Sequence, residues 1–199
     1  MTDATPQLIL ASASPRRAAL LAQLRLVFQV LPTDVDETPR PNEPAATLVE
    51  RLALAKARAS ALTTDQRVPT LGADTVVVCD GVTLGKPIDR AAGLEMLERL
   101  SGRCHQVHTA VALVQHDRVA VCLSLSHVYF REISRREAEA YWASGEPHDK
   151  AGGYGIQGIG GIFVRRIEGS FSGIAGLPLA ETEALLDTFG VDTWQYRGA

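Results

Sequence analysis

Apolar residues along this chain fall into two patterns, short runs typical of strands and longer stretches with helical spacing. The short runs predict strands over 8–11, 28–31, 107–114, 119–130 and 161–167, together with a hairpin over 70–86. Helical spacing and capping residues predict helices that begin near residues 15, 45, 89, 134 and 178. Because strands and helices alternate, we expect an α/β fold.

The strongest local signal lies between the first predicted strand and the first predicted helix. Ser14 suits the N-cap of a helix, and Pro15 suits the first helical position, where no N–H is needed. Arg16 and Arg17 follow in the first turn, where the helix dipole disfavours cations unless an anion is bound. With Ser12 and the free N–H groups, they form a candidate phosphate cradle. The alternative, a pair of solvated arginines, does not explain the serines.

The Ala- and Leu-rich stretch 45–62 favours a long helix. Its apolar residues predict one buried stripe, formed by Leu48, Leu52, Ala55, Ala59 and Leu62. Lys56 lies at the edge of this stripe, where a lysine side chain ordinarily extends to solvent. The Pro-rich loop before the helix carries Asp36 and Glu37, which by themselves are typical of a solvated acidic loop.

The dipeptide Asp80-Gly81 between two apolar runs predicts a type I′ hairpin turn. Counting outward from this turn places Thr75 opposite Lys86, so Asp74 and Lys86 finish at the same end of the hairpin. A carboxylate and an ammonium placed together fit a metal–phosphate site. They also fit a structural ion pair, which is the commoner outcome for two such residues alone.

The glycine-rich segment 151–158 contains a formal match to the dinucleotide-binding pattern G-x-G-x-x-G over residues 153–158. That pattern should follow a strand and open a helix, whereas here a polar loop precedes it and an apolar run follows. We therefore exclude a dinucleotide-binding fold. Gln157 can donate and accept hydrogen bonds, so it is a candidate for contact with the edge of a base. A tight loop with a solvated Gln157 is the alternative.

The composition bounds the class of protein. The 199 residues are 46% hydrophobic and 22% charged, as in an ordinary globular domain. The net charge of -3 disfavours a nucleic-acid surface but allows a small anion in a locally basic site. We expect no membrane span and no signal peptide. Cys79, Cys104 and Cys122 lack metal-type spacing and indicate free thiols in a reducing compartment, so we expect a cytoplasmic protein.

Four motifs, in this order along the chain, resemble those of the Maf family of nucleotide pyrophosphatases. They occupy 10–17, 72–75, 85–87 and 176–179, and the resemblance extends from about residue 8 to about residue 189. Segments 146–158 and 167–171 resemble the branch that acts on dTTP and UTP, since the branch acting on 7-methyl-GTP lacks the Tyr-Gly-Ile-Gln run. Phe171 stands where that branch's pattern has Tyr.

The resemblance implies a role for each matching residue. The triphosphate would be bound by Ser12, Arg16, Arg17, Lys56 and Lys86. The metal ion and the attacking water would face Glu37 and Asp74, with Asp74 as the proton acceptor. Base preference would depend on Arg16, Thr75 and Gln157.

The resemblance also implies a fold, a reaction and partners. The fold would be a single domain over 1–199, with an elongated mixed sheet flanked by helices and two lobes around a central cleft. With Mg²⁺ or Mn²⁺, a homodimer would hydrolyse dTTP and UTP to the monophosphate and pyrophosphate, without a nucleic-acid or membrane partner. The alternatives are the same chemistry on 7-methyl-GTP or a modified pyrimidine nucleotide, a nucleotide-binding cell-division regulator with weak hydrolysis, and a phosphatase for a small metabolite.

Overall fold

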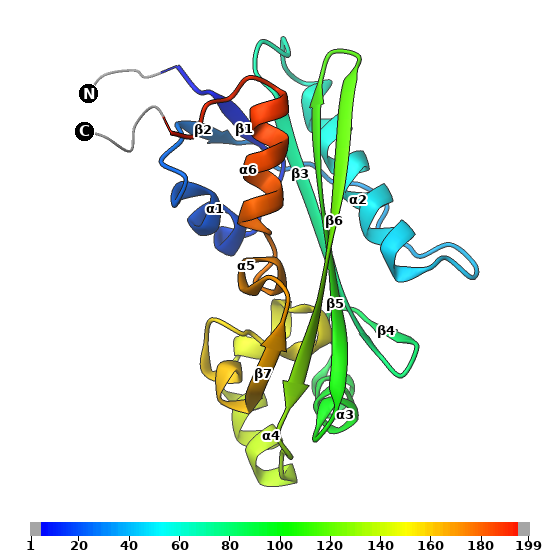
Figure 1. Cartoon of the computed structure of the whole chain (residues 1–199). Coiled ribbons are helices and arrows are strands. Elements are labelled where there is room, and N and C mark those ends of the chain that lie inside the picture. Colours follow the sequence, from blue (N-terminus) through cyan, green and yellow to red (C-terminus); the bar gives the residue numbers. More distant parts are fainter. Residues whose placement is uncertain (1–4, 195–199) are drawn as a thin grey trace. The chain divides into compact units, whose positions relative to one another are not determined.

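The computed structural model describes residues 5–194, which form a seven-stranded mixed sheet together with α-helices and short 3-10 helices (Figure 1). The strand order is β2-β1-β3-β5-β6-β7, and β4 pairs with β3. β1 is parallel to both β2 and β3, whereas the β3–β4 and β6–β7 pairs are antiparallel. The expected α/β class with a mixed sheet is confirmed.

The bounds of the elements agree with most of the sequence pattern. The strands are β1 (Leu8–Leu10), β2 (Phe28–Val30), β3 (Thr70–Cys79), β4 (Val82–Leu84), β5 (Cys104–Gln115), β6 (Arg118–Phe130) and β7 (Val164–Glu168). The α-helices are α1 (Pro15–Ala22), α2 (Ala45–Ala61), α3 (Arg90–Leu100), α4 (Arg135–Ala143), α5 (Phe171–Ile174) and α6 (Leu179–Thr188). Three 3-10 helices are η1 (Glu146–Asp149), η2 (Ala151–Gly153) and η3 (Ile159–Phe163).

The chain divides into two compact units. The first comprises Met1–Asp74, Thr109–Ser124 and Gly176–Ala199, and the second comprises Thr75–His108 and Leu125–Ala175. β3, β5 and β6 each contribute residues to both units. The single domain over 1–199 with a central cleft stays a prediction.

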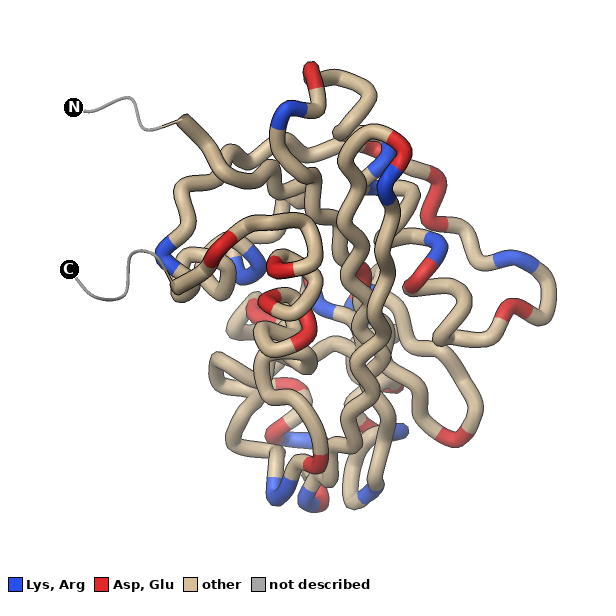
Figure 2. The backbone as a smooth tube through the Cα atoms, turned by 45° about the horizontal axis from the view of Figure 1, so that its top comes forward, with Lys and Arg blue, Asp and Glu red and all other residues tan. Residues whose placement is uncertain are grey.

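Charged residues of both signs are interspersed along the chain (Figure 2). This distribution agrees with the small net charge of -3 and leaves locally basic sites as the places where an anion would bind. Among residues 5–194, no helix is both long and apolar enough to cross a membrane.

In the first unit, β1 is almost completely buried between β2 and β3. The chain then enters α1 as the sequence predicts. Ser14 has an extended backbone, its side chain accepts a hydrogen bond from the backbone N–H of Arg17, and Pro15 occupies the first helical position. This cap fixes where α1 begins, because it satisfies a donor that has no partner within the helix.

Gly72 allows β3 to approach α2 closely. A Cβ atom at Gly72 would lie 2.2 Å from the carbonyl oxygen of Ala53 and 2.7 Å from the amide nitrogen of Ala57. Residues two apart in a strand share a face, so Asp74 faces the same helix as Gly72. Lys56 lies three residues after Ala53 and therefore on the same side of α2. The close approach thus brings Lys56 to Asp74.

The buried face of α2 differs from the predicted stripe. It is formed by Leu48, Val49, Leu52, Ala53, Lys56, Ala57, Ser60 and Ala61. Leu62 is 80% exposed and Lys56 only 9% exposed, so the expectations that Leu62 is buried and that Lys56 extends to solvent are both wrong. α2 is rotated about its axis relative to the predicted orientation, because the small residues Ala53 and Ala57 pack against Gly72.

The hairpin has the predicted turn. Asp80 and Gly81 have φ angles of 50° and 75°, as a type I′ turn requires, and Cys79 pairs with Val82. The pairing between β3 and β4 ends at Val77 and Leu84. Leu84 is also the last residue of β4. The strand pairing therefore stops before it reaches the predicted partners Thr75 and Lys86.

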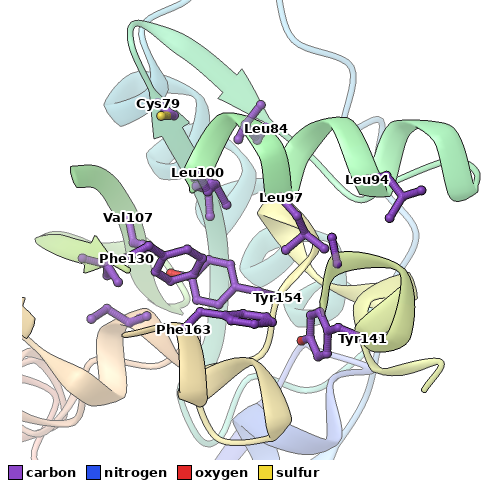
Figure 3. Close-up of a cluster of buried hydrophobic side chains, with 14 residues drawn as sticks. Cys79, Leu84, Leu94, Leu97, Leu100, Val107, Phe130, Tyr141, Tyr154 and Phe163 are labelled. Carbon is purple, nitrogen blue, oxygen red and sulfur yellow. The ribbon is translucent and has the colours of Figure 1, made fainter. Parts of the chain in front are cut away.

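The second unit has its own apolar core, which contains Leu84, Leu97, Leu100, Phe130, Tyr141, Tyr154 and Phe163 (Figure 3). His105 also lies here, with its ring centroid 4.8 Å from that of Phe130 and 5.4 Å from that of Tyr154. Its Nε2 atom lies 2.9 Å from the Tyr154 hydroxyl. Burial lowers the pKa of His105 to about 4, because the imidazolium form loses its hydration in this core.

Two segments near the end of the second unit depart from the sequence pattern. The strand predicted over 161–167 begins later, because Ile159 and Gly160 donate their backbone N–H groups to the Glu146 carboxylate and residues 159–163 form η3. The sequence pattern also does not predict α5, a single turn that Ser170 caps by accepting from Gly173 N.

Gly72→Ala should destabilise the protein by roughly 2–3 kcal/mol, because the new methyl group meets backbone atoms of α2 that cannot turn aside. Urea denaturation followed by circular dichroism measures the effect. Gly85→Ala is the matched control, since a Cβ atom there has no neighbour within 4 Å and the backbone needs no positive φ. Equal midpoints for the two variants would contradict the close approach.

The low pKa of His105 predicts acid sensitivity. The unfolded chain binds a proton near pH 6.5 and the folded one only near pH 4, so the free energy of unfolding falls as the pH drops through this window. Between pH 7 and pH 5 this one group should cost roughly 2 kcal/mol. Urea denaturation at both pH values should show a smaller loss for His105→Gln than for the wild type. Equal losses would show that His105 titrates normally.

Candidate active site

The residues of the predicted phosphate cradle belong to the first unit, and Ser12 and Arg17 are in contact there. The hydroxyl of Ser12, a buried residue, accepts a hydrogen bond from the Ser14 backbone N–H at 3.2 Å and from Arg17 Nη1 at 3.4 Å. Arg17 Nε donates to the carbonyl oxygen of Gly176 at 2.9 Å. Arg17 is half-buried and fixed by protein acceptors, so the alternative of a solvated surface arginine is wrong for this residue.

The electrostatic surroundings of Arg17 connect this cradle to the acidic residues of the same unit. Burial lowers the pKa of the Arg17 guanidinium, and the neighbouring charge of Arg16 lowers it further. Attraction to Asp74 and Glu37 acts in the opposite direction. Two cations and two carboxylates therefore interact electrostatically within one unit.

Lys56 joins the two predicted acids. Its Nζ atom donates to Asp74 Oδ1 at 2.6 Å and lies 2.6 Å from Glu37 Oε1. Lys56 and Asp74 are 9% and 7% exposed, whereas the Glu37 side chain is 54% exposed. The Asp74 carboxylate thus has a buried cation as its partner, and Glu37 reaches the same ammonium from the solvent side. Lys56 is thus an ion-pair partner of Asp74, whereas the hairpin register placed Lys86 near this carboxylate.

A second ion pair fixes the loop that carries Glu37. Arg51 on α2 donates from Nε and Nη2 to the two carboxylate oxygens of Glu43, at 2.6 and 2.7 Å, and from Nη2 to the Thr38 carbonyl oxygen at 3.2 Å. The Arg51 hydrogen bonds lower the pKa of the Glu43 carboxyl to about 2. Because Arg51 and Lys56 lie on the same helix, the loop is attached to the element that also presents the central ammonium.

The remaining predicted site residues belong to the second unit. Thr75 is half-buried and follows Asp74 directly in β3, and Lys86 is exposed just beyond β4. Gln157 is exposed on the loop between η2 and η3. The structure thus brings Glu37, Lys56 and Asp74 into contact and attaches Arg17 to Ser12.

Two contributors have no separate signal in the residue pattern. Gly176 has a φ of 110°, and its carbonyl oxygen anchors Arg17 from a segment 159 positions away in the chain. The resemblance includes Gly176 in the motif 176–179, but only the fold shows what its backbone contacts. Similarly, nothing in the local sequence pairs Glu43 with Arg51, since the contact depends on how the loop folds back onto α2.

The fold and this charged cluster define an α/β protein whose first unit is suited to a phosphate-bearing ligand. Residues 7–189 match the family of Maf-like proteins. A Hahella chejuensis protein called dTTP/UTP pyrophosphatase is 51% identical over 199 aligned residues, which cover 98% of this chain and 99% of that protein. A Saccharophagus degradans protein of the same name is 50% identical, with 97% and 93% covered.

The chain therefore belongs to the Maf family. Among solved structures, the Ham1 protein of Staphylococcus aureus aligns with a TM-score of 0.46 and 16% identity, over 62% of this chain and 71% of that one.

Lys56→Met should destabilise the protein by on the order of 3 kcal/mol, because it leaves the buried Asp74 carboxylate without its cation. In an Asp74→Asn background the same change should cost much less, which a double-mutant cycle by urea denaturation measures. Glu37→Gln is the matched control and should cost less than about 1 kcal/mol, because Glu37 is largely solvated. Additive costs for Lys56→Met and Asp74→Asn would contradict the coupling.

Proposed function

We propose that this protein hydrolyses dTTP and UTP to the nucleoside monophosphate and pyrophosphate. The observation that carries the proposal is the Glu37–Lys56–Asp74 contact, with Arg17 of the same unit electrostatically coupled to both acids. The relatives named dTTP/UTP pyrophosphatase, which align over nearly the whole chain, support the substrate. The reaction belongs to the hydrolases that act on acid anhydrides.

The acidic pair fits a divalent cation by the chemistry of its donors. Mg²⁺ is commonly held by one or two carboxylates, with water and substrate phosphate oxygens completing its coordination. Within residues 5–194, no group of three or more His, Cys, Asp or Glu side chains is placed to hold a metal ion. We propose that Glu37 and Asp74 hold Mg²⁺ or Mn²⁺, which when bound neutralises phosphate charge and lowers the pKa of a coordinated water.

The basic residues have a clear task in this reaction. A triphosphate repels an approaching oxygen nucleophile, and fixed cations reduce that repulsion without having to reorganise. Arg17 is already oriented by Gly176 and Ser12, and Lys56 by two carboxylates. We assign triphosphate contacts to Ser12, Arg16, Arg17, Lys56 and Lys86.

Asp74 is the proposed proton acceptor. Water attacks the α-phosphorus and forms the new P–O bond, the bond to the α,β-bridging oxygen breaks, and pyrophosphate leaves. The proton released by the water passes to the Asp74 carboxylate. No Ser or Cys nucleophile is needed, since phosphoryl transfer depends mainly on positioning and charge.

Base preference is assigned to Arg16, Thr75 and Gln157. The exposure of Gln157 supports this role, because its amide can donate to one base atom and accept from another. A cytoplasmic location is supported by Cys79, Cys104 and Cys122, which are all free thiols. The homodimer stays a prediction.

A panel of nucleoside triphosphates with Mg²⁺ or Mn²⁺, with products separated by chromatography, tests the function. We expect dTTP and UTP to give pyrophosphate faster than ATP, GTP or 7-methyl-GTP. Release of orthophosphate, a preference for 7-methyl-GTP, or binding without turnover would contradict the proposal. Asp74→Asn should lower kcat about 100-fold or more. Asp117→Asn, which changes an exposed aspartate of the same unit, should leave kcat unchanged.

A further inference from the structure

Glu146 of the second unit has a carboxylate that serves the protein's own backbone. Its Oε1 atom accepts from the Tyr141 hydroxyl at 2.8 Å and from Gly160 N at 3.0 Å. Its Oε2 atom accepts from Ile159 N at 2.8 Å. The carboxylate therefore accepts hydrogen bonds from two successive backbone N–H groups that have no partner in a regular strand or helix. These two groups follow directly after the loop that carries Gln157.

The glycines of this loop make room for the Glu146 carboxylate. A Cβ atom at Gly158 would lie 2.3 Å from Glu146 Oε2, and one at Gly155 would lie 3.0 Å from Glu146 Oε1. A Cβ atom at Gly160 would lie 2.6 Å from the Tyr141 hydroxyl oxygen. The backbone of the loop is thus packed directly against the Glu146 and Tyr141 oxygens. Glycine is needed at these positions because a larger side chain would collide with those oxygens.

The start of the loop is held by the same pair of side chains. The Tyr141 hydroxyl accepts from Gly155 N at 3.0 Å while it donates to Glu146. Gly158 N donates to the Gly155 carbonyl oxygen at 3.2 Å, which closes a turn over residues 155–158. Gln157 lies within this turn, between the anchor at Gly155 and the anchors at Ile159 and Gly160.

The ionised form of Glu146 is the one that this arrangement favours. Burial by itself would raise the pKa of the Glu146 carboxyl, but the hydrogen bonds from Gly160, Ile159 and Tyr141 outweigh it, and the pKa lies below its ordinary value. Lys150 adds a nearby positive charge, and its Nζ donates to the Glu146 carbonyl oxygen at 2.5 Å and to Asp149 Oδ1 at 2.7 Å. A charged acceptor makes stronger hydrogen bonds than a neutral one.

We infer that Glu146, with Tyr141, is a positioning residue for substrate choice, which holds the 155–160 turn so that Gln157 presents its amide in one orientation to the base. The inference rests on the proposed function, because it assigns to Glu146 the support of the residue that reads the base. Glu146 itself is assigned no contact with the substrate. We therefore expect a change at Glu146 to alter the order in which the enzyme prefers the bases of its substrates. This effect should depend entirely on Gln157.

Glu146→Gln is the variant that tests this. It keeps the shape but directs an amide NH₂ at the Ile159 or Gly160 N–H, so that two donors face each other. Glu139→Gln is the matched control, because Glu139 is a glutamate of the same unit that pairs with Arg135 and Arg90. The ratio of kcat/KM for dTTP to that for GTP should fall about tenfold in Glu146→Gln, the equivalent of one hydrogen bond, and stay constant in Glu139→Gln.

The Gln157→Ala background shows whether Glu146 acts by positioning Gln157 or by supporting the fold of the site in general. Gln157→Ala should itself lower the dTTP-to-GTP ratio, and Glu146→Gln should lower it no further in that background. An equal loss of kcat/KM for every base in Glu146→Gln, or a further fall in the ratio in the double variant, would overturn the inference. A wild type that fails to hydrolyse dTTP and UTP would instead overturn the proposed function.

Amide hydrogen exchange provides a readout that does not depend on activity. In the wild-type protein, Ile159 and Gly160 should exchange slowly, because their N–H groups are bonded to the carboxylate. Glu146→Gln should speed exchange across residues 155–160, whereas Glu139→Gln should not. Unchanged exchange in Glu146→Gln would overturn the inference even if the substrate ranking shifts.

Discussion

The buried ammonium of Lys56 is the centre on which the candidate site depends. It compensates the charge of the buried Asp74 carboxylate by direct contact, and it also reaches Glu37. The contact exists because Gly72 lets β3 come within touching distance of the α2 backbone at Ala53. The strand β3, the helix α2 and the loop that carries Glu37 therefore all contribute to the contacts of the Lys56 ammonium. A site built on a strand and a helix holds its groups more precisely than one built on loops alone.

Two cations of the first unit, Arg17 and Lys56, are held in place by other groups of the protein. Arg17 is held by the Gly176 carbonyl and by the Ser12 hydroxyl, and the loop that carries Glu37 is tied to α2 through Glu43 and Arg51. Such fixed charges are worth more to a phosphoryl transfer than mobile ones, because they need no reorganisation as negative charge shifts during the reaction. The same arrangement keeps Asp74 and Glu37 near Arg17, and their attraction opposes the repulsion between Arg16 and Arg17.

The glycine-rich segment of the second unit illustrates a different use of glycine. Gly155, Gly158 and Gly160 leave room for the oxygens of Glu146 and Tyr141, which then bind the loop backbone directly. The turn is consequently defined by a buried tyrosine and a carboxylate, in a region that has little regular secondary structure. An exposed residue such as Gln157 gains a defined orientation from this support, which a loop of the same sequence on its own would lack.

The sequence by itself determined what depends on neighbouring residues. The cap at Ser14 and Pro15 and the Asp80-Gly81 turn are local arrangements, and both are present. The motifs further indicated the family and the candidate residues. Only the tertiary structure decided which way α2 turns, which cation partners Asp74, and what anchors Arg17 and the 155–160 loop. Those contacts join residues up to 159 positions apart, and their geometry follows from packing between elements, which local propensity does not encode.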